Sequence, residues 1–212
     1  MKKFLLTIVA AVAMIGAANA QGLMVGGTIS YEHDGPTRYD GDIIAFARGT
    51  SNLTISPSVF YFVNENLAVG GFVGVSFDRE RNYDAAGKII DNATVKGMLF
   101  GIEPAVRYYL LNDEKFGIYG QASLPVAFGS RSDDAKTVDE NIFSWGFQVC
   151  PGVSYNITDN LTVDLTLGGI FDFTKINVTD DTMPNAKATS NHSTNFNVNL
   201  FNGVSLSLYY KL

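Results

Sequence analysis

The stretch that decides the fold runs from Pro151 to Leu167 and reads PGVSYNITDNLTVDLTL. Both of its halves alternate apolar with small or polar residues, which is the pattern of a β-strand with one apolar face. The polar cluster Thr158-Asp159-Asn160 separates the halves. Asn and Asp favour tight turns because they tolerate left-handed backbone angles and bond their own backbone. The stretch therefore predicts a β-hairpin.

Two earlier segments repeat this hairpin. They begin at Pro57 and Pro104, so that the three prolines are spaced 47 residues apart, and each opens a Pro-x-Val-x-Tyr run. A polar cluster and a second alternating run follow each time, which indicates three hairpins and therefore six strands. One strand before them (22–32) and one after (195–212) predict eight strands in all. Because proline removes a ladder donor, we interpret each repeated proline as a bulge or local irregularity.

The N-terminus has the features of an export signal. Lys2 and Lys3 precede an apolar run that ends in the small-x-small site Ala18-Asn19-Ala20. The run is shorter than the ~20 residues that a membrane span needs, which favours a cleaved signal peptide over an anchor. We predict a signal peptide over residues 1–20 and one domain over residues 21–212.

No later segment supplies an apolar run long enough for a membrane helix, so a membrane-embedded domain would have to be a closed β-barrel. The net charge of −6 argues against a nucleic-acid partner. Cys150 is the single cysteine, which excludes an internal disulfide and suggests a buried thiol. We expect no cofactor and no metal, because no phosphate loop, zinc spacing or EF-hand pattern is present.

The two faces of the predicted strands differ in kind. A water-soluble ligand carrier of the lipocalin type would turn the apolar face inward, whereas a membrane barrel turns it toward lipid. Aromatic residues at both ends of the apolar face and charges on the other face favour the membrane barrel. The predicted girdle contains Tyr61, Tyr108, Trp145, Tyr155 and Tyr210. The predicted lumen charges are Asp78, Glu103, Arg107, Asp164, Asp172 and Lys211.

Short turns alternate with long predicted loops at residues 33–50, 79–93, 131–141 and 175–194. In outer-membrane barrels the short turns face the periplasm and the long loops face outward, and an even strand count places both termini on the periplasmic side. We therefore expect an all-β, eight-stranded, antiparallel up-and-down transmembrane barrel in the outer membrane.

The repeated Pro-x-Val-x-Tyr runs, the Asn-Leu-x-Val segments at 66–69 and 160–163, and the terminal strand Leu208-Tyr209-Tyr210-Lys211-Leu212 resemble a known family. It is the small outer membrane protein beta-barrel domain family, related in architecture to OmpX- and OmpA-type, porin-like barrels. The resemblance implies that the barrel assembly machinery recognises the C-terminal strand. That family usually ends in Phe or Trp, where this chain has Leu212. It implies no shared reaction, since a fold does not specify a function.

Three functional hypotheses follow. The first is a non-enzymatic, monomeric barrel that contacts outer-membrane lipid and lipopolysaccharide and acts structurally or through its four extracellular loops. The second is a narrow porin-like channel, although paired charges filling the lumen would explain the same residues. The third is a lipid-modifying enzyme, which is disfavoured because His33 and His192 both fall in predicted loops, and His192-Ser193 stands beside no acidic residue.

Overall fold

The computed structural model describes residues 22–34, 47–83, 89–90, 94–133, 138–180, 191–197 and 204–212. The predicted signal peptide and most of the predicted loop residues lie outside these ranges. The described residues hold no helix long and apolar enough to cross a bilayer. Their strands are β1 (Leu23–Asp34), β2 (Ala47–Asn64), β3 (Leu67–Tyr83), β4 (Val95–Asn112), β5 (Phe116–Ser123), β6 (Val126–Asp133), β7 (Asp139–Asn156), β8 (Leu161–Leu167), β9 (Phe171–Asp180), β10 (Asn191–Asn197) and β11 (Val204–Lys211).

Three pairs of these elements are segments of longer strands. β5 and β6 keep one register against both β4 and β7, and only Leu124 and Pro125 separate them. β8 and β9 follow one another along β7, separated by residues 168–170. The predicted strand 195–212 corresponds to β10 and β11, and residues 198–203 between them lie outside the described ranges. Joined in this way, the elements form the predicted eight-stranded antiparallel barrel.

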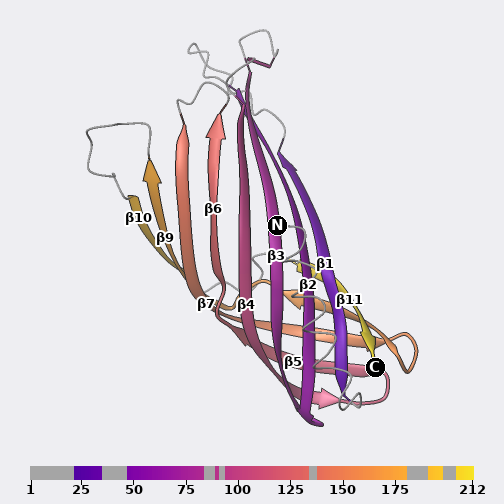
Figure 1. Ribbon diagram of the computed structural model, residues 1–212. Coiled ribbons are helices and arrows are strands. Elements are labelled where there is room, and N and C mark those ends of the chain that lie inside the picture. Colours follow the sequence, from indigo (N-terminus) through magenta and orange to yellow (C-terminus); the bar gives the residue numbers. More distant parts are fainter. Residues whose placement is uncertain are drawn as a thin grey trace.

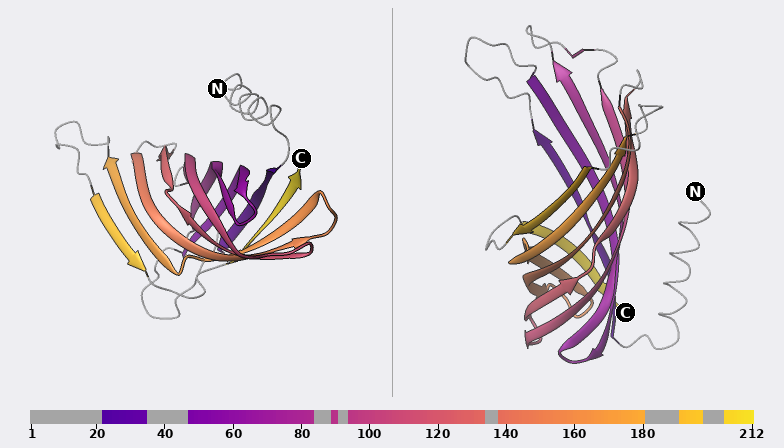
Figure 2. Two further views of the ribbon diagram at one scale, coloured as in Figure 1. Left: turned by 90° about the horizontal axis from the view of Figure 1, so that it is seen from below. Right: turned by 90° about the vertical axis from the view of Figure 1, so that its left-hand side faces the viewer.

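The ring closes at the end that carries the short turns. Met24–Gly27 of β1 pair with Leu208–Lys211 of β11, and β11 continues the ring through β8 to β7. A hydrogen bond of 2.5 Å between the hydroxyls of Thr28 and Ser207 extends this seam. Toward the loop end, the described part of β1 pairs with β2 and β10 pairs with β9 (Figures 1 and 2).

The repeated prolines lie where the ladder is interrupted on one side. The β2–β3 pairing skips Ser56 and Pro57 without a change of register, and the pairing of β4 with β5 and β6 skips Glu103 and Pro104 in the same way. Each of the three prolines faces a glycine on its other side: Pro57 with Gly27, Pro104 with Gly71 and Pro151 with Gly120. A Cβ on Gly27 would lie 2.9 Å from the Cα of Pro57, so a larger residue would push these two strands apart.

Several strands extend beyond their predicted ends. β3 continues to Tyr83 and β6 to Asp133, so Arg79, Arg81 and Arg131 lie in strands, whereas we predicted them in loops. His33 belongs to β1, and His192 belongs to β10, so their predicted loop positions are also wrong. The physical reason is length: an 18-residue strand such as β4, tilted ~40°, rises about 45 Å, well above an apolar band of ~25 Å. Backbone pairing continues where the side chains have already become polar.

The predicted alternation separates the two faces. Outward positions carry the exposed apolar and aromatic side chains, including the predicted girdle residues Tyr61, Tyr108, Trp145, Tyr155 and Tyr210. Inward positions near the turn end form a compact core. The core contains Met24, Phe60, Ala68, Ala105, Tyr109, Tyr119 and Tyr209.

We expect a lysine at Val73, an outward position near the middle of β3, to destabilise the barrel by about 2–4 kcal/mol, because the ammonium would lie at the bilayer midplane. Lysine at Val63, an outward position of β2 beside the turn, should cost about 0–1 kcal/mol because it reaches the interface. Urea unfolding in phospholipid vesicles measures both. Equal costs at the two positions would contradict the lipid-facing assignment.

Candidate functional site

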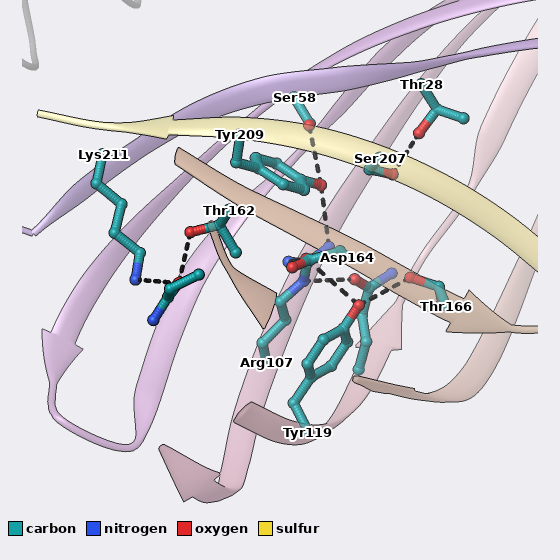
Figure 3. A network of polar contacts seen from close by, with 12 residues as sticks. Thr28, Ser58, Arg107, Tyr119, Thr162, Asp164, Thr166, Ser207, Tyr209 and Lys211 are labelled. Atoms are coloured by element: carbon teal, nitrogen blue, oxygen red, sulfur yellow. Dashed lines mark hydrogen bonds and ion pairs between the residues drawn. The ribbon is translucent and has the colours of Figure 1, made fainter. Parts of the chain in front are cut away.

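Arg107 occupies the centre of the lumen near the turn end (Figure 3). Its guanidinium donates three hydrogen bonds: from Nη1 to Asp164 Oδ2 at 2.5 Å, from Nε to Gln121 Oε1 at 2.8 Å, and from Nη2 to the Tyr209 hydroxyl at 3.0 Å. Arg107 and Asp164 are both 0% exposed. The residues Arg107, Asp164, Gln121, Tyr119 and Tyr209 are called the lumen cluster below.

Aromatic rings surround the same guanidinium. Its Cζ lies 4.0 Å from the ring centroid of Phe60, 4.7 Å from that of Tyr119 and 5.2 Å from that of Tyr209. These ring faces attract a cation, and the attraction is strongest where water is excluded. The lumen therefore stabilises the charge of Arg107 in two ways, through one carboxylate and through three ring faces.

The remaining polar atoms of the aromatic residues are also bonded. The Tyr119 hydroxyl lies 2.8 Å from the Thr166 hydroxyl and donates to Asp164 Oδ2 at 3.4 Å. The Tyr209 hydroxyl accepts a hydrogen bond from the Ser58 hydroxyl at 3.2 Å. The lumen cluster thus draws on β4, β5, β8 and β11, contacts Ser58 and Phe60 of β2, and ties opposite walls of the barrel together.

A second set of contacts lies between the lumen cluster and the turns. Lys211 Nζ donates to Asn156 Oδ1 at 2.9 Å, and the Thr162 hydroxyl donates to the same oxygen at 2.7 Å (Figure 3). Thr162 is buried to the same degree as the core aromatics. These contacts add a layer to the side chains that fill the turn end.

Toward the loop end, the inward charges are less buried. Glu103 accepts a hydrogen bond from Gln148 Nε2 at 2.8 Å, and Asp172 accepts one from the Thr174 hydroxyl at 3.0 Å. Further along, the Arg131 guanidinium contacts three carboxylates. They are Asp78 at 2.9 Å, Glu80 at 3.2 Å and Glu140 at 3.9 Å.

The structure places the six predicted lumen residues in three separate groups. Arg107 and Asp164 pair directly, Lys211 lies in the layer nearest the turns, and Asp78 belongs with Arg131 near the loops. Glu103 and Asp172 lie between these groups and have amide or hydroxyl partners. Glu103 and Arg107, which share a strand, have different partners.

Sequence reasoning missed two parts of these groups. Tyr119 was not singled out, although it alternates in step with the inward Gln121, and this alternation was the available signal. Arg131 was assigned to a loop, so its inward direction could not be inferred. In the described ranges, no three His, Cys, Asp or Glu side chains come close enough to hold a metal ion.

We expect Arg107→Leu and Asp164→Leu each to destabilise the barrel by about 3–5 kcal/mol, because each leaves one buried charge without its counter-ion. The double variant should lose far less than the sum of the two, since no uncompensated charge remains. Urea unfolding of the refolded protein measures all three variants, with Lys115→Gln in an exposed turn as a control. Additive losses would contradict the coupling.

Gly152 is predicted to be intolerant of any side chain. A Cβ at this position would lie 2.2 Å from the Tyr119 ring, which is held by Asp164 and Thr166. Gly152→Ala should therefore lower the temperature at which the folded barrel converts to the slower-migrating unfolded form on a gel. Gly120→Ala is the matched control, because no atom lies within 4 Å of its added Cβ. An equal effect of the two substitutions would contradict this packing.

Three solved structures are similar to this chain over most of its length. Neisserial surface protein A matches with a TM-score of 0.44 and 16% identity, covering 90% of this chain and 96% of that one. The translocator domain of the autotransporter NalP from Neisseria meningitidis gives 0.46 and 16%, covering 92% and 65%. Outer membrane protein W of E. coli gives 0.46 and 16%, covering 91% and 98%.

No curated protein matches the chain. Residues 4–206, by contrast, match the family described as outer membrane protein beta-barrel domain, which confirms the resemblance noted in the sequence. This match spans most of the chain, and the family implies an outer-membrane location. The chain belongs to the outer membrane protein beta-barrel domain family.

Proposed function

We propose that the protein is a non-enzymatic and non-conducting outer-membrane barrel whose closed scaffold holds four extracellular loops for structural or surface contacts. In this proposal a signal peptide directs export, both termini face the periplasm, and the assembly machinery binds the C-terminal strand. The barrel acts as a monomer among outer-membrane lipid and lipopolysaccharide. Such a role needs a rigid, sealed scaffold.

The observation that carries the proposal is the filled lumen at the turn end. Arg107, Asp164, Tyr119, Tyr209 and Phe60 are each exposed by no more than 1%. An eight-stranded barrel is just wide enough for side chains to fill, so this layer leaves no room for a hydrated ion. Opening it would separate the buried ion pair, which is costly.

The narrow channel is the competing hypothesis, and the half-buried charges around Arg131 favour it at the loop end. Those charges would line an entrance, but a solute would still have to pass the lumen cluster. The two hypotheses therefore differ in one measurable property, the conductance of the intact barrel.

In planar bilayers we expect no conductance steps from the wild-type barrel. Steps should appear in a Tyr119→Ala/Tyr209→Ala variant, which removes two rings from the filled layer, and should be absent from the matched Tyr119→Phe/Tyr209→Phe variant. Heat-modifiable gel migration shows that each variant is folded. Conductance steps from the wild-type barrel that Glu103→Gln reduces would establish the channel instead. A folded Tyr119→Ala/Tyr209→Ala variant without conductance steps would contradict the proposal that this layer blocks ion flow.

The loop role has its own test. Deletion of the gene should raise sensitivity to detergent and bile, and wild-type protein should restore resistance. A chain with a Gly/Ser segment in place of residues 181–190 should fold but fail to restore it, whereas full rescue would contradict a role for this loop.

The absence of enzymatic activity is tested on lipid A, whose mass should not change when the protein is expressed. A mass shift that is lost in His192→Ala would overturn that part of the proposal.

A further inference from the structure

The outer surface of β2, β3 and β4 changes character between two adjacent rows of paired residues. One row consists of Leu53, Phe77 and Met98, all exposed and apolar. The next row toward the loops consists of Ser51, Arg79 and Lys96. The boundary between apolar and polar side chains therefore occurs at the same register on three neighbouring strands.

The distance of this boundary from the turn end matches the thickness of the membrane. The outward positions of β3 from Leu67 to Phe77 are apolar or glycine, and at ~3.3 Å per residue and ~40° tilt they rise about 25 Å. The outward positions of β4 from Tyr108 to Met98 cover the same span. Arg79 and Lys96 thus lie at the level of the lipid headgroups on the side of the loops.

Charges of opposite sign are separated between the two faces of β3. In the run Asp78-Arg79-Glu80-Arg81, alternation turns the two acids inward, where both contact Arg131. The two arginines point outward, and the ion pairs of the described residues do not include either of them. Arg79 also directly faces Lys96 across the ladder, which places two cationic residues side by side on this surface.

These residues border a groove of about 420 Å³ on the outer surface. Tyr31, Leu53 and Phe77 supply an apolar part that continues the lipid-facing band, and Arg79, Arg81 and Lys96 supply the cationic part. Ser51, Gly97 and Asp78, whose carboxylate is paired with Arg131, complete the lining. A ligand that suits both parts has a phosphate group joined to an apolar chain. We propose that this groove binds the phosphate-bearing headgroup of a bilayer lipid in the leaflet on the loop side. The inference rests on the outer-membrane placement of the proposed function.

The test uses the mature barrel refolded in a neutral detergent, to which phosphatidylglycerol is added. Phosphatidylglycerol should raise the temperature of the gel-migration transition, and phosphatidylcholine, whose headgroup is zwitterionic, should raise it much less. Because each cation near an anionic surface contributes ~1 kcal/mol, the variant Arg79→Gln/Arg81→Gln should need about 30-fold more phosphatidylglycerol for the same shift. Lys115→Gln removes an exposed cation at the opposite end and should behave as wild type.

Three outcomes would overturn the site: equal stabilisation by the two lipids, an unchanged phosphatidylglycerol requirement in the Arg79→Gln/Arg81→Gln variant, or equal stabilisation by inorganic phosphate alone. The last outcome would indicate a soluble anion. The groove is on the outer surface and the lumen cluster is inside, so the same variant should remain non-conducting. Loss of phosphatidylglycerol binding in the Arg79→Gln/Arg81→Gln variant, without any conductance, supports the site. Conductance from the wild-type barrel would contradict the proposed function but would not affect the result on lipid binding.

Discussion

Hydrocarbon offers no hydrogen-bond partner to a peptide group, so every N–H and C=O within the bilayer must be paired by the chain itself. In this protein the constraint falls on one short seam, where Met24–Gly27 meet Leu208–Lys211. The two strands come from opposite ends of the chain. Around the seam, Leu212 N–H donates to Leu23 C=O at 2.8 Å, and Thr28 bonds Ser207. Without this pairing, β1 and β11 would both be open edges in lipid.

Closure also creates an interior in which Arg107 has to be accommodated. Removing a guanidinium from water is expensive, and a single counter-ion seldom compensates for the cost. Here the cost is shared among a carboxylate, an amide, a hydroxyl and three ring faces, contributed by four other strands of the barrel, β2, β5, β8 and β11. The same contacts that compensate the charge also hold the barrel walls in register. The impermeability that we propose for this barrel therefore has the same physical origin as the stability of this layer.

The parts of the fold that were predictable are those carried by local periodicity. The three proline-headed hairpins determine the strand count, and period-two alternation assigns Asp164 and Arg107 to the inside. Strand ends were not predictable in this way, because Arg79 and Arg131 continue ladders beyond the hydrocarbon, where periodicity in hydrophobicity disappears. The pairing of Arg107 with Asp164 could not be predicted from the sequence either. Asp164 lies 57 residues away, and only the curvature of the closed barrel brings β8 next to β4 across the lumen.

The strand formed by β8 and β9 changes its register against β7 by two residues between these two segments, and this shift has an evolutionary consequence. Two residues of β7, Cys150 and Pro151, lie opposite the four residues 167–170, and yet Leu165 and Phe173 on either side both face lipid. An insertion of two residues preserves the parity of a strand, whereas an insertion of one would exchange its faces. Barrels of this kind can thus lengthen or shorten in steps of two at such an irregularity. A change by one residue there would exchange the two faces of the strand beyond it and turn its charged side chains toward hydrocarbon.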